Sequence, residues 1–259
     1  MNKNQVFTVL QNAGGIRAAR IITENTKNFS KIKTLYFAHL LRHGMPVAKI
    51  IKQKWFYGLN FYTNRHTLDP RPETETLVSA VISDHQATSG LRILDLGTGT
   101  GCIICALVKN LDSATGLAID KSRRALRVAR RNIAKFNIAD RIKTTKASFN
   151  RRRNLGTKYD IIVSNPPYIA RNDPRVNIGA THDPKMALYA SNNGLAAYQS
   201  IARNATEWIT DTGKLYLEIG QGQAPAIKNI FIQSGWTHLR SEYDLLNIER
   251  VLVFQRSRP

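Results

Sequence analysis

The chain has 259 residues, a length that suits one full α/β domain with a small additional domain. Its hydrophobic content of 42% is ordinary for a globular protein, and no apolar run approaches the roughly 20 residues of a membrane span. The formal net charge is +20, from 38 Lys and Arg against 18 Asp and Glu. A polyanionic partner such as RNA, DNA or a ribosome explains this charge, and so does a general basic bias, because the charge is spread along the whole chain.

The first 54 residues are basic and predict helices over residues 5–11, 16–23 and 31–42, the last of them ended by Gly44 and Pro46. Residues 55–63 alternate aromatic and polar positions and predict a β-hairpin with its turn near residues 58–60. We therefore predict a short helical domain over residues 1–54, a hairpin linker over 55–70 and a larger domain over 71–259. The N-terminus lacks the apolar core of a secretory signal, which favours a cytoplasmic protein, with a mitochondrial location as the minor alternative.

Two cysteines, Cys102 and Cys105, have the CxxC spacing of some redox and metal sites. A zinc site needs a second pair of ligands, but the sequence has no other Cys and its six His never pair at i, i+4. Both Cys lie in the apolar run 102–108, which predicts a buried helix. We therefore predict no metal site, and the lack of a disulfide framework indicates a reducing compartment.

From residue 91 strands and helices alternate. The pattern predicts strands over 92–96, 115–120, 141–146, 159–164 and 214–219, followed by two strands over 236–243 and 249–255 that a short turn joins. It predicts helices over 73–83, 100–110, 122–137, 195–210 and 224–234, with Ser122 as an N-cap. This order predicts an α/β fold with a seven-stranded, mostly parallel sheet and an antiparallel edge strand.

A glycine-rich loop, LDLGTGTG at residues 94–101, lies where a strand meets a helix, which is where ligands bind in open α/β sheets. A dinucleotide-binding fingerprint has its third glycine one residue later than Gly101, and a phosphate-binding loop contains Gly-Lys-Ser/Thr. The loop at residues 94–101 therefore matches neither motif. Asp120 ends the next strand, where an acid accepts hydrogen bonds from ribose hydroxyls. Phe149, which follows Ser148 after the third strand, either stacks on an adenine or belongs to the core. These residues predict a cofactor that contains adenosine, bound by Gly97, Thr98, Gly99, Thr100, Gly101, Asp120, Ser148 and Phe149.

The loop Asn165-Pro166-Pro167-Tyr168 follows the fourth strand on the same edge of the sheet. An amide or aromatic amine nitrogen is a poor nucleophile because its lone pair is delocalised. The Asn165 side-chain oxygen and the Pro166 carbonyl supply two acceptors that orient such an NH2 group, and the prolines hold them in place. Tyr168 offers a flat face to a planar group. The loop predicts methylation of a planar nitrogen, and adenine N6, guanine N2 and glutamine N5 all satisfy this argument.

The chain resembles the release factor glutamine methyltransferases (the HemK/PrmC family) from about residue 42 to residue 254. The resemblance rests on the glycine loop, which is similar to the first motif of class I S-adenosylmethionine methyltransferases, and on the Asn-Pro-Pro-Tyr loop. It rests also on the segments DPRPETE at 69–75, GLAAY at 194–198, LEIG at 217–220 with Gln223, and on Asp244 with Arg250.

The resemblance implies a Rossmann-like class I methyltransferase domain that uses S-adenosylmethionine to methylate N5 of the glutamine in the Gly-Gly-Gln loop of a peptide chain release factor. It implies a helical N-terminal domain that docks that protein. Asn165 would contact the cofactor, and the substrate would contact Arg71, Glu75, Asn165, Pro166, Pro167 and Tyr168, of which Asn165, Pro166 and Tyr168 are the catalytic candidates.

The chain departs from the family pattern at three places: the helical region is short, Ser148 replaces a common acid, and His182-Asp183-Pro184 stands where Glu-Pro is usual. The alternatives are a nucleic-acid N-methyltransferase, a ribosomal-protein glutamine methyltransferase and a non-catalytic binding protein. The segment from Arg71 to Glu75 favours the release factor branch. A nucleic-acid enzyme would be expected to carry base-flipping or target-recognition segments, which this sequence lacks.

Overall fold

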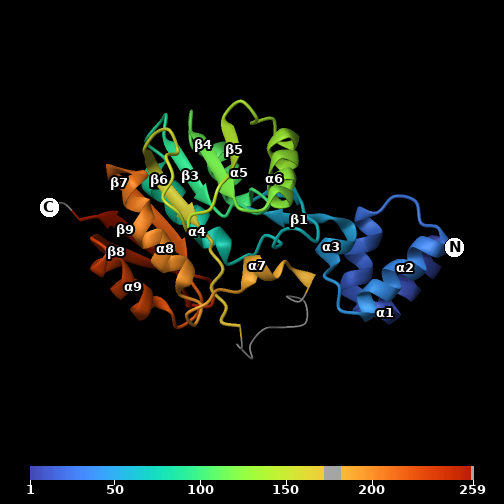
Figure 1. Cartoon of the computed structure of the whole chain (residues 1–259). Helices are drawn as coiled ribbons and strands as arrows, with labels where there is room; N and C mark the ends of the chain where they lie inside the picture. Colours follow the sequence, from blue (N-terminus) through green and yellow to red (C-terminus); the bar gives the residue numbers. More distant parts are fainter. Residues whose placement is uncertain (172–181, 258–259) are drawn as a thin grey trace.

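A seven-stranded sheet forms the centre of the computed structural model, which describes residues 1–171 and 182–257 (Figure 1). The strand order is β5-β4-β3-β6-β7-β9-β8, and β9 runs in the direction opposite to the other six strands. This arrangement confirms the predicted α/β fold, with the reversed strand lying next to the edge strand β8. The strands are β3 (Arg92–Leu96), β4 (Thr115–Asp120), β5 (Ile142–Lys146), β6 (Tyr159–Ser164), β7 (Ile209–Glu218), β8 (Trp236–Tyr243) and β9 (Glu249–Arg256).

The central strands are buried on both faces, which explains their continuous apolar sequences. Successive side chains point to opposite faces, so Ile93 joins one apolar cluster while Leu94 joins the other. The first cluster lies under α4 (Thr74–His85), α5 (Cys102–Asn110) and α6 (Arg123–Lys135), and the second under α8 (Ala196–Asn204) and α9 (Ala224–Gln233). The C-terminal ends of the parallel strands therefore meet at one edge between two layers of helices.

Two local predictions in this domain are confirmed. Ser122 is the N-cap of α6, where its Oγ accepts a hydrogen bond from the Ala125 amide at 3.2 Å. Cys102 and Cys105 are free, buried residues of α5. Burial raises the pKa of Cys102 to about 12, so its thiol is protonated at neutral pH.

The N-terminal helices α1 (Lys3–Asn25), α2 (Lys31–Arg42) and α3 (Val47–Ile51) pack around an apolar cluster of their own, beside the larger domain (Figure 1). The break expected between residues 11 and 16 is present at Gly15, whose φ of 84° interrupts α1. The short helix α3 was not predicted, because Pro46 was interpreted only as the end of α2. Proline is also well suited to begin a helix, and Pro46 directly precedes the first residue of α3.

The predicted hairpin is formed by β1 (Gln53–Phe56) and β2 (Leu59–Tyr62), with its turn at residues 57–58. Phe56 and Phe61 are buried in the same cluster as α4 and α5, so the hairpin packs onto the larger domain. Its position brings the following loop, residues 63–71, to the edge of the sheet where the strands end.

The helix predicted over residues 195–210 is shorter in the structure. It ends at Asn204, a 3-10 turn covers Ala205–Glu207, and β7 already begins at Ile209. Pairing with β6 accounts for the early strand, since the Tyr159 amide donates to the Trp208 carbonyl at 2.7 Å and Ile209 pairs with Tyr159. A further short helix, α7 (Lys185–Leu188), was not predicted. In the described part of the chain, no helix has the length and apolar character needed to cross a membrane.

Candidate active site

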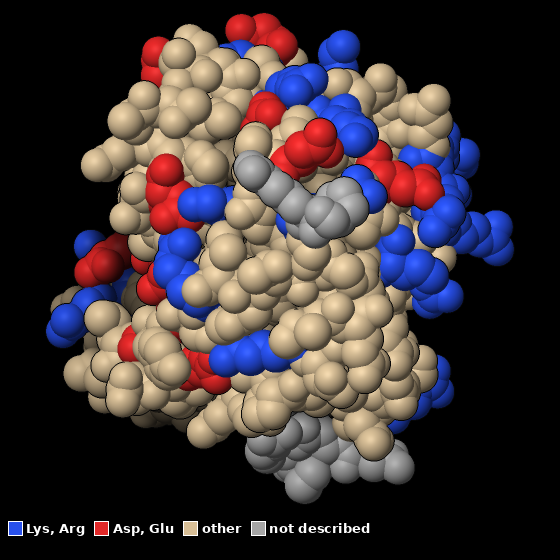
Figure 2. All heavy atoms as spheres, turned by 90° about the vertical axis from the view of Figure 1, so that its left-hand side faces the viewer, with Lys and Arg blue, Asp and Glu red and all other residues tan. Residues whose placement is uncertain are grey.

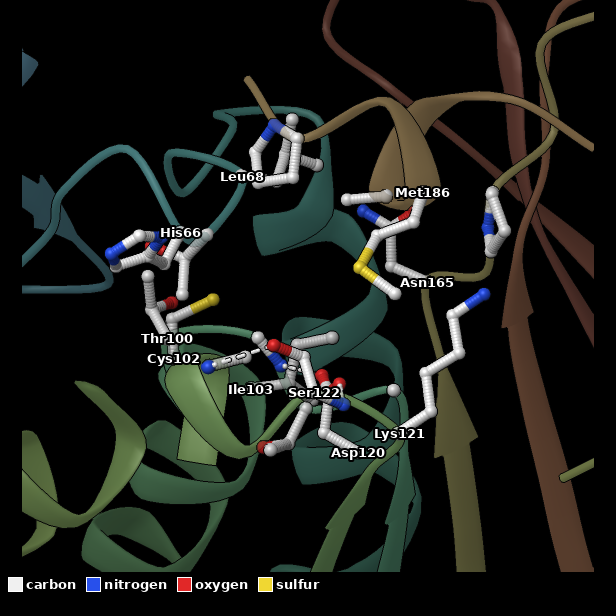
Figure 3. A pocket seen from close by; sticks show the side chains of 18 of the residues that line it. His66, Leu68, Thr100, Cys102, Ile103, Asp120, Lys121, Ser122, Asn165 and Met186 are labelled. Carbon is white, nitrogen blue, oxygen red and sulfur yellow. Dashed lines mark hydrogen bonds between the residues drawn. The ribbon is translucent and has the colours of Figure 1, made fainter. Parts of the chain in front are cut away.

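A cavity opens at the C-terminal edge of the parallel strands, where open α/β sheets bind their ligands (Figure 3). The glycine loop and the residues after β4 and β5 form one side. The opposite side consists of two segments, residues 66–71 and 184–187, which we call the cover; His66, Leu68 and Met186 face the cavity from it. The cavity thus lies where strands of the sheet, the hairpin loop and α7 meet.

The glycine loop is shaped to bring its backbone close to a ligand. Gly97 and Gly99 have φ values of 78° and 54°, and both line the cavity. A Cβ at Gly97 would lie 3.6 Å from Cε1 of Phe149 and would fill space between the loop and that ring. Phe149 packs against the second apolar cluster and also lines the cavity, so its position is compatible with a place in the core and with stacking on an adenine.

Asp120 fixes the loop from the end of β4. Its Oδ2 accepts a hydrogen bond from the Gly99 amide at 3.1 Å, and its Oδ1 accepts one from the Ser122 amide at 2.7 Å. Burial raises the pKa of Asp120, and these two amides lower it. A carboxylate has about four lone-pair positions, so each oxygen keeps capacity for a second donor on the cavity side.

A second carboxylate, Asp95, lies fully buried beneath the loop. Its Oδ2 accepts a hydrogen bond from Thr98 Oγ1 at 2.6 Å, while Oδ1 has no hydrogen-bond partner among residues 1–171 and 182–257. Burial raises the pKa of Asp95 to about 7. Asp95 therefore changes its charge near neutral pH directly under the residues that line the cavity.

The side-chain amide of Asn165 is held in one orientation. Its Nδ2 donates to Thr74 Oγ1 at 3.1 Å, and the buried carboxyl of Glu218, at the end of β7, lies close enough to Thr74 and Asn165 for both to lower its pKa. Burial raises the pKa of Glu218 to about 7. Because Nδ2 is engaged by Thr74 on α4, the Oδ1 end of Asn165 is the acceptor available to the cavity, which Asn165 lines (Figure 3).

The backbone of Tyr168 is held from two sides. Gln223 Nε2 donates to the Tyr168 carbonyl at 3.0 Å, and Gln223 Oε1 accepts from the Gly220 amide at 3.1 Å. Gly194, with φ of 87°, approaches so closely that a Cβ there would lie 2.1 Å from the Tyr168 carbonyl oxygen. Burial raises the pKa of Tyr168, so its phenol is protonated at neutral pH. These contacts stiffen the loop that carries Asn165.

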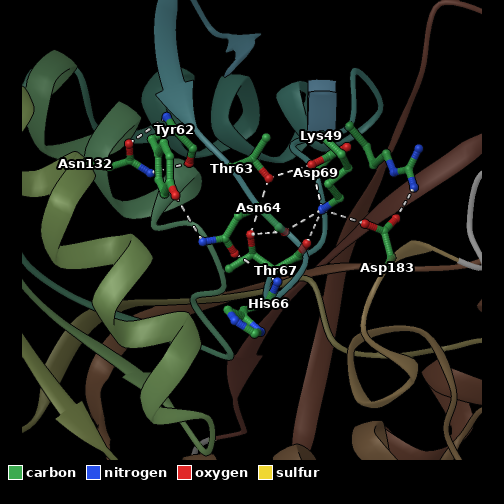
Figure 4. Close-up of polar contacts among 10 residues, drawn as sticks. Lys49, Tyr62, Thr63, Asn64, His66, Thr67, Asp69, Asn132 and Asp183 are labelled. Carbon is green, nitrogen blue, oxygen red and sulfur yellow. Dashed lines mark hydrogen bonds and ion pairs between the residues drawn. The ribbon is translucent and has the colours of Figure 1, made fainter. Parts of the chain in front are cut away.

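One buried lysine joins the first segment of the cover to Asp183, the residue directly before the second segment (Figure 4). Lys49 Nζ, on α3, lies 2.8 Å from Asp69 Oδ1 and 2.9 Å from Asp183 Oδ1, and the Lys49 side chain is 3% exposed. It also donates to the carbonyls of Asn64 at 2.8 Å and Thr67 at 2.5 Å. Arg71 adds a contact of 2.7 Å to Asp183 Oδ2. The N-terminal helical region thus contributes the charge that holds both sides of the cover.

Basic side chains gather beside the cavity on α6. Its exposed residues include Arg123, Arg124, Arg127, Arg130, Arg131 and Lys135, and the helix contains no acid. Burial lowers the pKa of His66 on the cover, and the charges of Arg124, Arg65 and Arg127 lower it further.

The face formed by the β7–β9 side of the molecule is different, since Figure 2 shows acidic side chains interspersed with the basic ones there. Ion pairs such as Lys228–Glu249 and Arg250–Asp244 belong to β9 and its neighbours. The face of α6, whose charged residues are all basic, therefore differs from this mixed face.

The structure brings most of the predicted site residues to one cavity. Gly97, Thr98, Gly99, Thr100, Asp120, Ser148, Phe149, Arg71, Asn165 and Pro167 line it. Among the described residues, four predicted ones do not line it: Gly101, Pro166, Tyr168 and Glu75. Gly101 is the N-cap of α5, and Pro166 and Tyr168 belong to the loop itself.

Glu75, which we predicted to contact the substrate, makes a hydrogen bond within the protein instead. Its Oε1 accepts a hydrogen bond from the Tyr57 amide at 2.9 Å, in the hairpin turn where Tyr57 has φ of 48°. This geometry gives Glu75 a role in holding the hairpin against α4.

Sequence reasoning missed Lys49, Thr74, Glu218 and Met186 as site residues. Glu218 carried a signal, because it is the single acid in the apolar run of residues 215–219.

Comparisons with known proteins agree with this geometry. A model of the family described as "Methyltransferase small domain" matches residues 69–183. The release factor glutamine methyltransferase of Streptococcus pneumoniae is 39% identical over 213 residues, which cover 82% of this chain and 73% of that protein. The chain belongs to the release factor glutamine methyltransferase family. The family's protein from Thermodesulfovibrio yellowstonii is 35% identical over 250 residues, or 92% of this chain and 87% of the relative.

A solved methyltransferase from Pyrococcus furiosus shares the fold, with a TM-score of 0.58 and 18% identity over 88% of this chain and 98% of that one. The cofactor of this family, S-adenosylmethionine, fits the cavity. Glycines without side chains leave space beside Phe149, and Asp120 has free acceptor positions for ribose hydroxyls. Several of the segments that carry the family resemblance line the cavity or support it, as Gln223 and Gly194 do for Tyr168.

Proposed function

We propose that this protein transfers a methyl group from S-adenosylmethionine to the N5 amide nitrogen of the glutamine in the Gly-Gly-Gln loop of a peptide chain release factor. The observation that carries the proposal is the fixed amide of Asn165. Its Nδ2 donates to Thr74, with the Glu218 carboxyl nearby, so its Oδ1 is presented as an acceptor at the cavity. A primary amide such as glutamine has the two N–H donors that this acceptor and the Pro166 carbonyl require.

In this proposal the loop residues orient a weak nucleophile. The Asn165 Oδ1 and Pro166 carbonyl oxygens accept the two N–H groups, which favours pyramidalisation and exposes the nitrogen lone pair. The two prolines and the supports of Tyr168 keep these acceptors in position, and positioning supplies a large part of the rate enhancement. S-adenosylmethionine supplies a methyl group that its sulfonium already activates. No strong base is required, because the alkylated amide nitrogen is acidic and releases its proton to water.

We propose the following roles for the other cavity residues. Gly97 to Gly101 follow the cofactor with their backbone, Asp120 accepts from the ribose hydroxyls, and Phe149 with Ser148 contacts the adenine. Arg71 and the rest of the cover close over the site and border the path of the substrate. The helices of residues 1–54 dock the release factor, and we place the reaction in the cytoplasm.

A nucleic-acid substrate is the second candidate, and the basic face of α6 favours it. Arg131 lies 3.8 Å from the centre of the Tyr62 ring on the adjoining hairpin, so guanidinium groups and an aromatic ring are neighbours there. Surfaces of this composition bind phosphate backbones and stack bases.

Transfer of a radioactive methyl group distinguishes the two candidates. The protein is incubated with labelled S-adenosylmethionine and, separately, a release factor, its Gly-Gly-Gln glutamine-to-alanine variant, and total RNA or DNA. We expect label only in the unaltered release factor. Label in nucleic acid, or label that survives loss of the glutamine, would contradict the proposed function.

A further inference from the structure

The turn between β8 and β9 presents two leucines to solvent. Leu245 and Leu246 have exposed fractions of 105% and 80%, and Tyr243 at the end of β8 is 53% exposed. Single exposed apolar residues are common on protein surfaces and need no explanation. Three such residues within four positions of one turn form an apolar tip, which is a different situation. We call residues 243–246 the leucine tip.

The tip is held rigidly rather than left loose. Asp244 Oδ1 accepts hydrogen bonds from the amides of Leu246 at 2.9 Å and Ile248 at 3.0 Å, and its Oδ2 accepts from Arg250 Nε at 2.8 Å. Asn247 closes the turn with φ of 57°. The side chains of Asp244 and Arg250 are themselves mostly buried. The turn therefore fixes two leucines in water before any partner arrives, which lowers the entropy lost on binding.

The tip lies on the catalytic edge of the sheet. The chain leaves β8 and enters β9 at the edge where β6 and β7 end, because Glu218 pairs with Val251 and the Ile219 amide donates to the Arg250 carbonyl at 2.8 Å. The strand β6 leads into Asn165, and the turn joins β8 to β9. In the order of the sheet, β6 lies two strand spacings from β9 and three from β8, a lateral distance of about 10–14 Å. The charge of Arg250 also reaches Tyr168, whose pKa it lowers against the larger effect of burial.

A protein that presents a glutamine to Asn165 must cover this region. A standard interface buries about 800 Å² on each partner, which corresponds to a disc of radius about 16 Å. Centred on the Asn165 loop, such a disc includes the leucine tip. A nucleotide base inserted into the cavity offers phosphate and sugar at that distance, which do not match two leucines.

We propose that the leucine tip is a docking element for the protein substrate and that Leu245 and Leu246 insert into an apolar surface of the release factor beside its glutamine loop. This inference rests on the proposed function and adds a second contact to it, outside the cavity. Affinity for the whole protein then depends on the tip, whereas the chemistry at the amide does not.

The test compares two substrates: an intact release factor and a synthetic peptide of its Gly-Gly-Gln loop, which is too short to reach the tip. The variant Leu245→Ser/Leu246→Ser should raise the KM for the intact protein about ten-fold or more, because a few apolar anchors seated in the partner carry most of the energy of an interface. Its kcat, its KM for the peptide and its Kd for S-adenosylmethionine should equal those of the parent. Because both side chains are exposed, its Tm should also be unchanged.

Two control variants complete the design. Leu245→Met/Leu246→Met keeps an apolar tip and should keep the parental KM. Ile232→Ser removes an exposed apolar side chain near the end of α9, away from the catalytic edge, and should have no effect.

An unchanged KM for the intact protein in the double Ser variant would overturn the inference, and so would an equal rise for protein and peptide. A change in self-association without a change in KM would assign the tip to contacts between copies of this chain and would also overturn it. If the parent protein methylates neither substrate, the proposed function itself fails, a result distinct from these.

Discussion

Lys49→Met removes the positive charge that joins Asp69 of the cover to Asp183, while it keeps a long side chain in place. Asp69 and Asp183 then remain buried without that counter-charge. Breaking a buried ion pair by removing one partner costs about 3–5 kcal/mol. At the lower value, the Tm of a chain of this size should fall by roughly 6–12 °C.

The loss of stability in the Lys49→Met variant should increase as the pH rises. Burial raises the pKa of Asp183, and Lys49 is the main charge that opposes the increase. Without Lys49, the pKa of Asp183 rises further above its unfolded value. A group with a raised pKa contributes stability at low pH and loses it as the pH rises through that pKa. The Tm difference between variant and parent should therefore be smallest in acidic buffer and should grow as the pH rises.

Thermal unfolding over a pH series, with and without S-adenosylmethionine, measures both effects, and a lower cofactor affinity should accompany the lower Tm because Asp69 belongs to the cover. Lys158→Met is the matched control: Lys158 lies 3.9 Å from Asp211 with side chains 50% and 87% exposed, so its loss should cost less than about 1 kcal/mol. Lys49→Met/Asp183→Asn should recover much of the lost stability. Equal Tm changes for the Lys49 and Lys158 variants would refute the reasoning.

Four further substitutions address the site directly. Asn165→Ala should abolish methyl transfer while largely sparing cofactor affinity, and normal turnover in that variant would remove the central mechanistic claim. Asp120→Ala should chiefly weaken cofactor binding, which calorimetry measures as a raised Kd; an unchanged Kd contradicts its role. Burial raises the pKa of Glu218 to about 7, so stability is lost as the pH rises through that value; Glu218→Gln should raise the Tm relative to the parent above pH 7 and much less below it. Gly194→Ala should lower kcat sharply, because its Cβ would lie 2.1 Å from the Tyr168 oxygen, and parental kcat would show that the Asn165 loop tolerates displacement.

The sequence predicted the sheet well because its strands are short apolar runs that end at recognisable motifs. The same property placed Asp120 and Asn165 at the ligand-binding edge of the sheet, since Asp120 ends one such strand and Asn165 directly follows another. The helix over residues 195–210 was overextended because its last residues are drawn into β7 by pairing with β6, a contact that no local pattern encodes.

The missed residues share a different cause. Lys49 lies on a helix of five residues, too short to produce a periodic pattern, and its partners Asp69 and Asp183 are far away in the sequence. Thr74 can accept a hydrogen bond from Asn165 only because α4 and β7 place it beside Asn165 and Glu218. Glu75 was assigned to the substrate from a motif, but the neighbouring hairpin uses its carboxylate. Such roles depend on tertiary contacts, which propensity and spacing do not contain.

The position of Lys49 has a consequence for how the chain can be divided. A fragment that starts after α3 would contain the glycine loop and the Asn165 loop, yet it would bury Asp69 and Asp183 with only Arg71 beside them. We expect such a fragment to bind the methyl donor poorly and to be cleaved readily by proteases in the cover. The composition of the chain predicts a domain boundary near residue 54, whereas the part of the chain that supports the chemistry begins before that residue and includes Lys49. Natural truncations or fusions of this family at that point would need another cation to take the place of Lys49.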